Sequence, residues 1–177
     1  MHILMCNDDG ILADGLRRLA SYLSQYYRIT VVAPANEQSA KSHALTTEIP
    51  LKLDAYNGED ENPRLYALTG TPSDCMKFGL SYLLSDDMPD LVISGINHGF
   101  NLGSDVLYSG TVSAAMESCF YGIPGLALSV ERYSPERGDE MHPFIHELIE
   151  KIYVKGNFDG LLNVNFPLRG VCDWDHF

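Results

Sequence analysis

Two adjacent carboxylates, Asp8 and Asp9, follow directly after a short apolar run at the beginning of the chain. Carboxylates this close repel each other unless a cation or a solvated turn relieves the repulsion. The same segment, Asn7-Asp8-Asp9-Gly10, is also good turn chemistry in itself. Taken alone, the pair therefore fits a divalent metal site and an ordinary turn equally well.

Two further polar groups are expected at the same edge of the fold. Residues 94–97, which end at Asn97, come after a strand of buried type, and Ser109-Gly110-Thr111 comes just before a helix. In open α/β sheets the ligand crevice lies at the carboxyl ends of the strands. The available metal donors there are all oxygens, and oxygen ligands favour Mg²⁺, Mn²⁺ or Ca²⁺ over zinc.

The Ser109-Gly110-Thr111 segment predicts an anion-binding nest. A glycine lets the backbone approach a ligand closely, and successive N–H groups at a helix N-terminus attract phosphate. An ordinary Ser/Thr helix cap is the competing interpretation. Together with the acidic pair, the segment predicts a metal-dependent phosphatase in which Asp8 or Asp9 orients or deprotonates the attacking water.

The elements that must position these residues alternate between strand and helix patterns. Such alternation predicts an α/β fold, Rossmann-like and doubly wound, with a mostly parallel sheet and a β-hairpin insertion. Expected helices begin with Asp14 as N-cap, with Thr71 as N-cap, near 112 and near 143. The predicted strands are residues 2–7, 29–33, 48–53, 64–68, 90–94, 126–130 and 161–165.

Composition limits the classes of function. The 177 residues suffice for one domain, and a net charge of −12 is unfavourable for binding long nucleic acids. No apolar run reaches the ~20 residues that cross a membrane. The N-terminus has no room for a secretory signal before Asp8, so a cytoplasmic location is expected. The four cysteines show no CxxC pair and are expected to be free thiols.

Several blocks of the sequence resemble the signature segments of the SurE family, survival proteins that are metal-dependent 5'(3')-nucleotidases. The resemblance extends from residue 1 to about residue 167 in consistent order. The matching blocks are Asn7-Asp8-Asp9-Gly10, residues 32–34, 70–75, 94–103, 105–112 and 163–167.

The resemblance implies a SurE-like metallophosphatase domain at 1–167 and a divergent short tail at 168–177. It implies metal ligands at Asp8, Asp9, Ser39 and Asn97, although Gln38 and Ala40 around Ser39 depart from the family pattern. The implied contacts to the substrate phosphate are Asn101, Ser109, Gly110 and Thr111, and His98 is expected to have a supporting role.

The activity implied by the resemblance is metal-dependent hydrolysis of nucleoside monophosphates to nucleoside and phosphate. Cleavage of 3'-nucleotides and of short polyphosphate is implied as well, with Mg²⁺ or Mn²⁺ as the expected cation and Ca²⁺ as another option. Family members form homodimers or tetramers and usually continue for many tens of residues beyond Pro167. We therefore expect the C-terminal region of the family to be missing from this chain, which weakens the expectation of family-like assembly.

Other interpretations remain to be tested. A receiver-like phosphorylation switch also has an acidic pair after its first strand, but it needs an acceptor aspartate after a later strand, where this chain has Asn97. A haloacid-dehalogenase-type phosphatase needs a DxD pattern, whose second position is Gly10 here. A non-catalytic anion-binding protein is the third alternative. His142 and His146 have the i,i+4 spacing of a zinc pair, although a solvated helix face is the simpler expectation.

Overall fold

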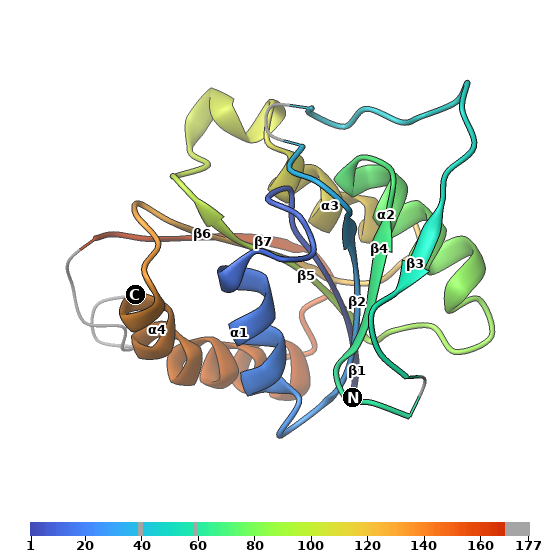
Figure 1. The fold of residues 1–177 in the computed structure, drawn as a ribbon. Helices are drawn as coiled ribbons and strands as arrows, with labels where there is room; N and C mark the ends of the chain where they lie inside the picture. The colour runs from blue at the N-terminus through green and yellow to red at the C-terminus, as the bar shows by residue number, and fades with distance from the viewer. Residues whose placement is uncertain (39–40, 59, 169–177) are drawn as a thin grey trace.

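A computed structural model describes residues 1–38, 41–58 and 60–168. Within these residues the chain forms a seven-stranded sheet of order β3-β4-β2-β1-β5-β6-β7 (Figure 1). Neighbouring strands are parallel except for the antiparallel β3–β4 pair. The strands are β1 (His2–Cys6), β2 (Arg28–Pro34), β3 (Leu53–Ala55), β4 (Arg64–Leu68), β5 (Leu91–His98), β6 (Gly125–Val130) and β7 (Leu161–Phe166).

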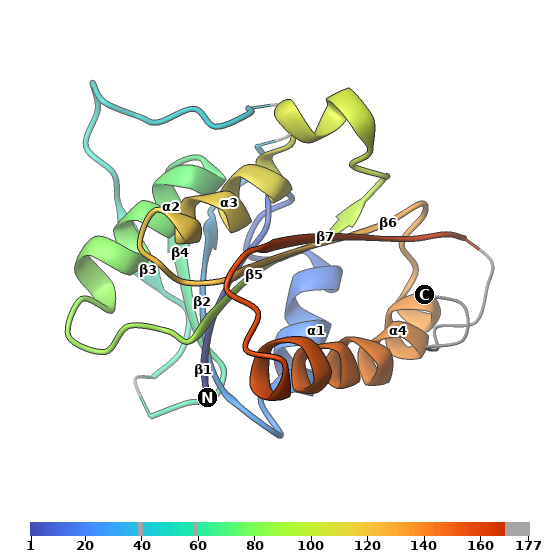
Figure 2. The same ribbon diagram turned by 180° about the vertical axis from the view of Figure 1, so that it is seen from behind.

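Helices cover both faces of the sheet, as Figures 1 and 2 show. One face carries α1 (Asp14–Leu23) and α4 (Pro135–Leu148), and the other carries α2 (Pro72–Phe78) and α3 (Gly110–Cys119). Three short helical segments accompany them: η1 (Gly79–Leu83) after α2, η2 (Gly103–Leu107) before α3 and η3 (Ile149–Lys155) after α4. The predicted doubly wound α/β class is therefore confirmed.

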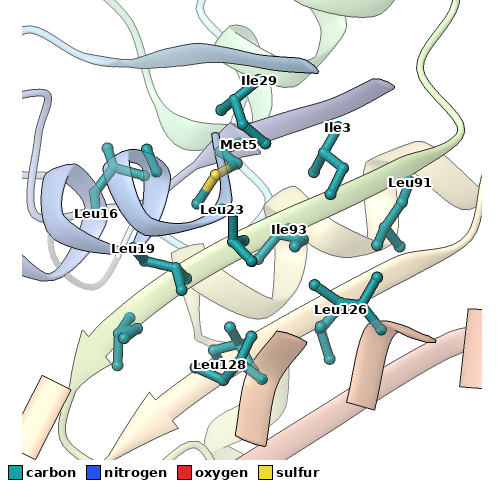
Figure 3. Packing of buried hydrophobic residues seen from close by; sticks show 14 of the residues in the cluster. Ile3, Met5, Leu16, Leu19, Leu23, Ile29, Leu91, Ile93, Leu126 and Leu128 are labelled. Carbon is teal, nitrogen blue, oxygen red and sulfur yellow. The ribbon is translucent and has the colours of Figure 1, made fainter. Parts of the chain in front are cut away.

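Alternation along β1 explains why both faces are covered. Ile3 and Met5 point to the side of α1, where Figure 3 shows them among side chains such as Leu23 and Ile93. Leu4 and Cys6 belong to the second apolar cluster, against α2. Because each face of this strand is apolar, β1 is buried along its whole length, as central parallel strands usually are. The predicted apolar face of α1 (Leu16, Leu19, Ala20, Leu23) is likewise buried.

The helix start predicted from Thr71 is confirmed in detail. The Thr71 hydroxyl accepts a hydrogen bond from the Asp74 N–H at 3.1 Å, and the Asp74 carboxylate accepts from the Thr71 N–H at 2.9 Å. This reciprocal capping box, with Pro72 in the first turn, satisfies backbone donors that the helix itself leaves unpaired.

Four predicted boundaries are wrong. Ala13, in an extended conformation, is the N-cap of α1, so that Asp14 lies in the first turn. The hairpin is present, but β3 occupies 53–55 rather than 48–53, because only those residues pair with β4. β5 continues through residues 94–97 after a register shift against β6. Pro143 lies inside α4, since Ser134 and Pro135 supply the start signal eight residues earlier.

Among the described residues, no helix is both long enough and apolar enough to span a membrane.

Candidate active site

The site lies where β1 and β5 run side by side. From β1 the sheet continues through β2 and β4 on one side and through β5, β6 and β7 on the other. The strand order therefore reverses between β1 and β5, which is the switch point of the sheet. Ligands of doubly wound sheets bind at the carboxyl ends of such strands. Asp8 and Asp9 follow β1 there, and Asn97 is near the end of β5. A cavity of about 320 Å³ opens at this edge, lined by Asp8, Asn97, His98, Phe100, Asn101, Asp105, Tyr108, Ser109 and Gly110.

A tight turn presents the two aspartates. The Asn7 side chain accepts a hydrogen bond from the Gly10 N–H and donates one to the Gly10 carbonyl, both at 3.1 Å. Gly10 has a φ of +101°, a conformation that other residues rarely adopt. The turn interpretation of this segment is thus correct, and the turn places Asp8 in the lining of the cavity.

Helix α3 meets Asp8 directly. Asp8 is 7% exposed, and its Oδ1 accepts a hydrogen bond from the Thr111 hydroxyl at 2.7 Å. A Cβ atom at Gly110 would lie 3.0 Å from the Asp8 Cβ and 3.2 Å from its Oδ2. The absence of a side chain at Gly110 therefore lets the N-terminus of α3 approach the carboxylate closely.

Both aspartates hold their protons more tightly than exposed aspartates do. Burial is the main reason that the pKa of Asp8 is raised, and the Thr111 hydrogen bond opposes it. The pKa of Asp9 is raised to about 6, mainly by burial and then by the charges of Asp8 and Glu37, while His98 acts against the shift. A bound cation would reverse these effects, because it stabilises both carboxylates in the charged form.

The donors present fit a hard divalent cation. The Asn97 amide nitrogen donates to the Gly99 carbonyl at 2.9 Å, which turns its oxygen away from that bond and leaves it available as a ligand. Within the described residues there is no group of three or more His, Cys, Asp or Glu side chains that could hold a metal. A site here therefore depends on two carboxylates plus amide or hydroxyl oxygens, which Mg²⁺ and Mn²⁺ accept. The predicted ligand Ser39 lies outside the described residues.

Three of the predicted phosphate-contacting residues, Asn101, Ser109 and Gly110, line the same cavity as Asp8; we call them the second wall, which meets the acidic turn where Gly110 contacts Asp8. Ser109 is the N-cap of α3, and its hydroxyl accepts from the Val112 N–H at 3.1 Å. The capping interpretation is therefore correct, and it leaves the N–H groups of the first turn of α3 beside the cavity. Thr111 uses its hydroxyl on Asp8, so only its backbone remains for an anion.

Asn101 is held by side chains that the sequence interpretation did not single out. Its Nδ2 donates to Ser129 Oγ at 2.8 Å, its N–H donates to Asn165 Oδ1 at 2.8 Å, and its carbonyl accepts from Asn163 Nδ2 at 2.8 Å. Asparagines at alternate positions of β7 were the available signal, because a strand in a buried sheet rarely carries two of them without a polar partner.

Two aromatic residues at the cavity were also missed. Tyr108 is 68% exposed and Phe100 is 38% exposed, and both line the cavity beside Ser109 and Asn101. His98, predicted to have a supporting role, is exposed at the same mouth. Both rings therefore stand at the mouth of the cavity, next to residues predicted to contact phosphate.

The histidine pair of α4 does not form a solvated face, contrary to expectation. His142 is 3% exposed and its ring lies 5.3 Å from that of Tyr22, while His146 stacks on Tyr26 at 4.0 Å. The reason is that α4 packs across α1, which turns this side of the helix inward. The prediction of free cysteines is confirmed for Cys6, Cys75 and Cys119, and Cys172 lies outside the described residues.

The raised pKa of Asp9 predicts a specific pH dependence of stability. Because the folded chain holds this proton up to about pH 6 and an exposed aspartate releases it near 3.8, the carboxyl group supports folding below pH 3.8 and loses that contribution as the pH rises through 6. In the metal-free chain at pH 7, Asp9→Asn should raise the free energy of unfolding by about 1–2 kcal/mol, after allowance for solvent screening.

Urea unfolding in EDTA at pH 4 and pH 7 measures this effect. The gain should shrink toward pH 4, and the exposed-site variant Asp86→Asn should show little gain at either pH. If Asp9→Asn raised the free energy of unfolding equally at both pH values, the charge of Asp9 would not be the cause of the gain.

Comparison with known proteins identifies the family. A family model described as "Survival protein SurE" matches residues 3–176. The chain belongs to the SurE family. Its relatives include proteins named 5'-nucleotidase SurE from Thermoanaerobacter sp. (strain X514), 49% identical over 168 residues, and from Clostridium botulinum (strain Alaska E43 / Type E3), 44% identical over 174 residues.

A crystal structure of the SurE protein from Aquifex aeolicus has the same fold, with a TM-score of 0.81 and 37% sequence identity. It matches 94% of this SurE-family chain, which in turn covers 66% of the Aquifex chain. The Thermoanaerobacter relative is likewise covered to 66% of its length, and the Clostridium relative to 67%. The chain thus spans about two thirds of the length of these SurE proteins. That the relatives are longer agrees with what the resemblance implied.

Proposed function

We propose that this SurE-family chain is a metal-dependent 5'-nucleotidase that hydrolyses nucleoside monophosphates to nucleoside and phosphate. The observation that carries the proposal is the contact between Asp8 and the N-terminus of α3, which joins a carboxylate pair to a row of backbone N–H groups at one cavity. The name 5'-nucleotidase SurE, borne by relatives at 44–49% identity, supports nucleotides as the substrates.

The chemistry divides between the two walls of the cavity. Asp8, Asp9 and the Asn97 oxygen would hold Mg²⁺ or Mn²⁺, which when bound supplies positive charge for the phosphate oxygens and acidifies a water molecule. Asp9 or Asp8, beside that cation, would orient the attacking water or accept its proton. On the other wall, the first N–H groups of α3 and the Asn101 amide would bind the phosphate and stabilise charge in the transition state.

Local positive potential is needed because the chain as a whole carries a charge of −12. Asp8 and Asp9 would by themselves repel a phosphate dianion. The dipole of α3 contributes about half a positive charge at the cavity. A divalent ion balances the two carboxylates, so the helix end can then attract the substrate.

Phosphate release from AMP, GMP and CMP with Mg²⁺, Mn²⁺ or EDTA tests the proposal. We expect multiple turnovers that EDTA abolishes and added Mn²⁺ or Mg²⁺ restores. 3'-AMP and tripolyphosphate in the same assay test the wider specificity that the family resemblance implies, and light scattering of the same sample tests the dimer or tetramer. Nucleotide binding without turnover would favour the anion-binding alternative, and stable labelling by acetyl phosphate would favour the receiver-like one.

Tyr108 offers a test of nucleotide recognition separate from phosphate chemistry. Stacking of a base on an aromatic ring contributes roughly 1–3 kcal/mol, so Tyr108→Ala should raise the KM for AMP about ten-fold. The KM for ribose 5-phosphate, which has no aromatic ring to stack on Tyr108, should change less than about two-fold. Tyr82→Ala, a control with similar exposure away from the cavity, should leave both KM values unchanged. Equal effects of Tyr108→Ala on both substrates would exclude a role in base binding.

A further inference from the structure

Helix α3 carries a buried acid that faces away from the proposed chemistry. Glu117 is 5% exposed, and its Oε2 lies 2.6 Å from Nε2 of His43. Its Oε1 lies 3.8 Å from the ammonium group of Lys77 on α2. A carboxylate is seldom this buried without a partner, because desolvation of the charge is strongly unfavourable. The partner at hydrogen-bonding distance comes from the segment that precedes β3.

That segment, residues 41–46, lies over α2 and α3 and is fastened to them. Figures 1 and 2 show the chain from residue 41 passing over α2 on its way to β3. Besides the His43–Glu117 contact, three hydrogen bonds of similar length join the segment to the body of the protein. They run from Ser42 Oγ to the Leu107 carbonyl at 2.9 Å, from Thr71 Oγ1 to the Ala44 carbonyl at 2.7 Å, and from the Thr46 N–H to Asp74 Oδ1 at 2.9 Å.

Residues 41–46 are connected to the side of the cavity that Tyr108 and Ser109 form. Leu107, which accepts the Ser42 hydrogen bond, is the last residue of η2 and precedes Tyr108 and Ser109 in the cavity lining. On the acidic wall, the N–H of Gln38 donates to the Asp8 carbonyl at 2.8 Å. Residues 41–46 are therefore tied to the entrance side of the cavity, while Gln38, which precedes them in the sequence, contacts the aspartate turn.

His43 reaches from residues 41–46 to the last turn of α3. Glu117 lies seven residues after Gly110, which corresponds to about 10 Å of helix. The His43 ring also lies 6.1 Å from that of Phe120, one turn further on. Because α3 is buried over most of its length, Glu117 is a fixed point against which the more exposed segment can be ordered.

We propose that Glu117 is a positioning residue of the proposed nucleotidase: through His43 it holds residues 41–46 in place, and through Ser42 these residues hold the Leu107–Tyr108 wall against the substrate. The inference rests on the proposed function for its kinetic part. Its structural part, the ordering of residues 41–46 by Glu117, does not depend on catalysis. Glu117 does not line the cavity and is not assigned a catalytic role.

The test compares His43→Ala, Glu117→Ala and the conservative His43→Gln, whose amide can still donate to the carboxylate. In the metal-free protein, amide hydrogen exchange of residues 41–46 should accelerate about ten-fold in both alanine variants and stay near the wild-type rate in His43→Gln. With Mn²⁺ present, the KM for AMP should rise about ten-fold in the alanine variants, while kcat changes less than about three-fold. His43, partly exposed at 30%, provides the variant that keeps the fold if Glu117→Ala does not.

Lys52→Ala is the matched control, because it removes an exposed ion pair with Asp54 just beyond the same segment. It should change neither exchange nor KM. Unchanged exchange in His43→Ala would overturn the proposal, as would faster exchange with an unchanged KM. If the wild-type chain turns over AMP with no cation tested, the proposed function and the kinetic role are both overturned. If wild type turns over AMP and His43→Ala has the same kinetics, only the positioning role is overturned.

Discussion

Asp8→Asn should reduce metal-dependent phosphate release by about 10³-fold or more, while the protein remains folded. Asparagine has nearly the same size, and its amide oxygen can still accept the Thr111 hydrogen bond that the Asp8 carboxylate accepts at 2.7 Å. What the substitution removes is one of the two negative charges that would hold the cation. The expected loss is therefore one of chemistry rather than of structure.

Removing that charge should also stabilise the chain in the absence of metal. Burial raises the pKa of Asp8, which means that its ionised form is disfavoured in the folded protein. Asp8→Asn should consequently have a higher Tm than wild type in EDTA at pH 7, and this advantage should narrow when Mn²⁺ is added, because only wild type gains from binding.

Three measurements together decide this prediction. Calorimetric titration with Mn²⁺ should show strongly weakened binding, circular dichroism should show an unchanged fold, and the AMP assay should show the loss of turnover. Asp86→Asn, at an exposed position outside the cavity, should match wild type in all three. Full activity of Asp8→Asn would reject the metal-site assignment, and a collapsed circular dichroism spectrum would show that Asp8 is needed for folding.

Local sequence signals were sufficient for the elements that carry the acidic turn. The short apolar run before Asn7 predicted β1, and Thr71 as N-cap predicted the start of α2, because both signals depend on neighbours within a few residues. We expected Asp8 and Gly110 to lie close together because ligand crevices of open α/β sheets lie at the carboxyl ends of the strands. The structure brings the two residues into contact.

Contacts between residues that are far apart in the sequence could not be predicted from local patterns. Nothing near His142 indicates that α1 covers it. The same holds for Asn163 and Asn165, whose partner Asn101 lies more than sixty residues earlier in the chain. These contacts are created by the packing order of strands and helices, which periodicity does not specify. The start of α4 differs, because it has a local signal in Ser134 and Pro135 that the prediction from Pro143 did not use.

The His43–Glu117 contact illustrates the same limit in the proposed active site. Residues 34–47 form a long polar stretch of sequence, and long loops in compact domains are often functional. This pattern could not show that residue 43 meets residue 117, because the contact requires α2 and α3 to lie on one face of the sheet. Sequence patterns therefore indicate the ligands of a site, which lie at strand ends, but not the residues that support those ligands.

Gly110→Ala should lower kcat/KM for AMP by about 10²-fold without unfolding the protein. The added methyl group would lie 3.0 Å from the Asp8 Cβ, 3.2 Å from its Oδ2 and 3.3 Å from Cγ of Pro72, so the neighbours must shift by a few tenths of an ångström. The backbone of Gly110 is helical rather than left-handed, so alanine suits its conformation and favours the helix. The steric effect therefore falls on the geometry between the two walls of the cavity.

A displacement of α3 from Asp8 weakens both halves of the proposed site at once. It moves the N–H groups that would bind phosphate, and it loosens the Thr111 hydrogen bond that orients the Asp8 carboxylate. Gly79→Ala is the matched control, because its methyl group would meet Leu4 at 3.1 Å, equally tightly, but in the apolar cluster beneath α2. Both variants should lose some stability, and only Gly110→Ala should lose activity at a temperature where each is folded. If the two variants lose activity in parallel, packing of the domain limits turnover; if neither does, the end of α3 is not in contact with the reacting phosphate.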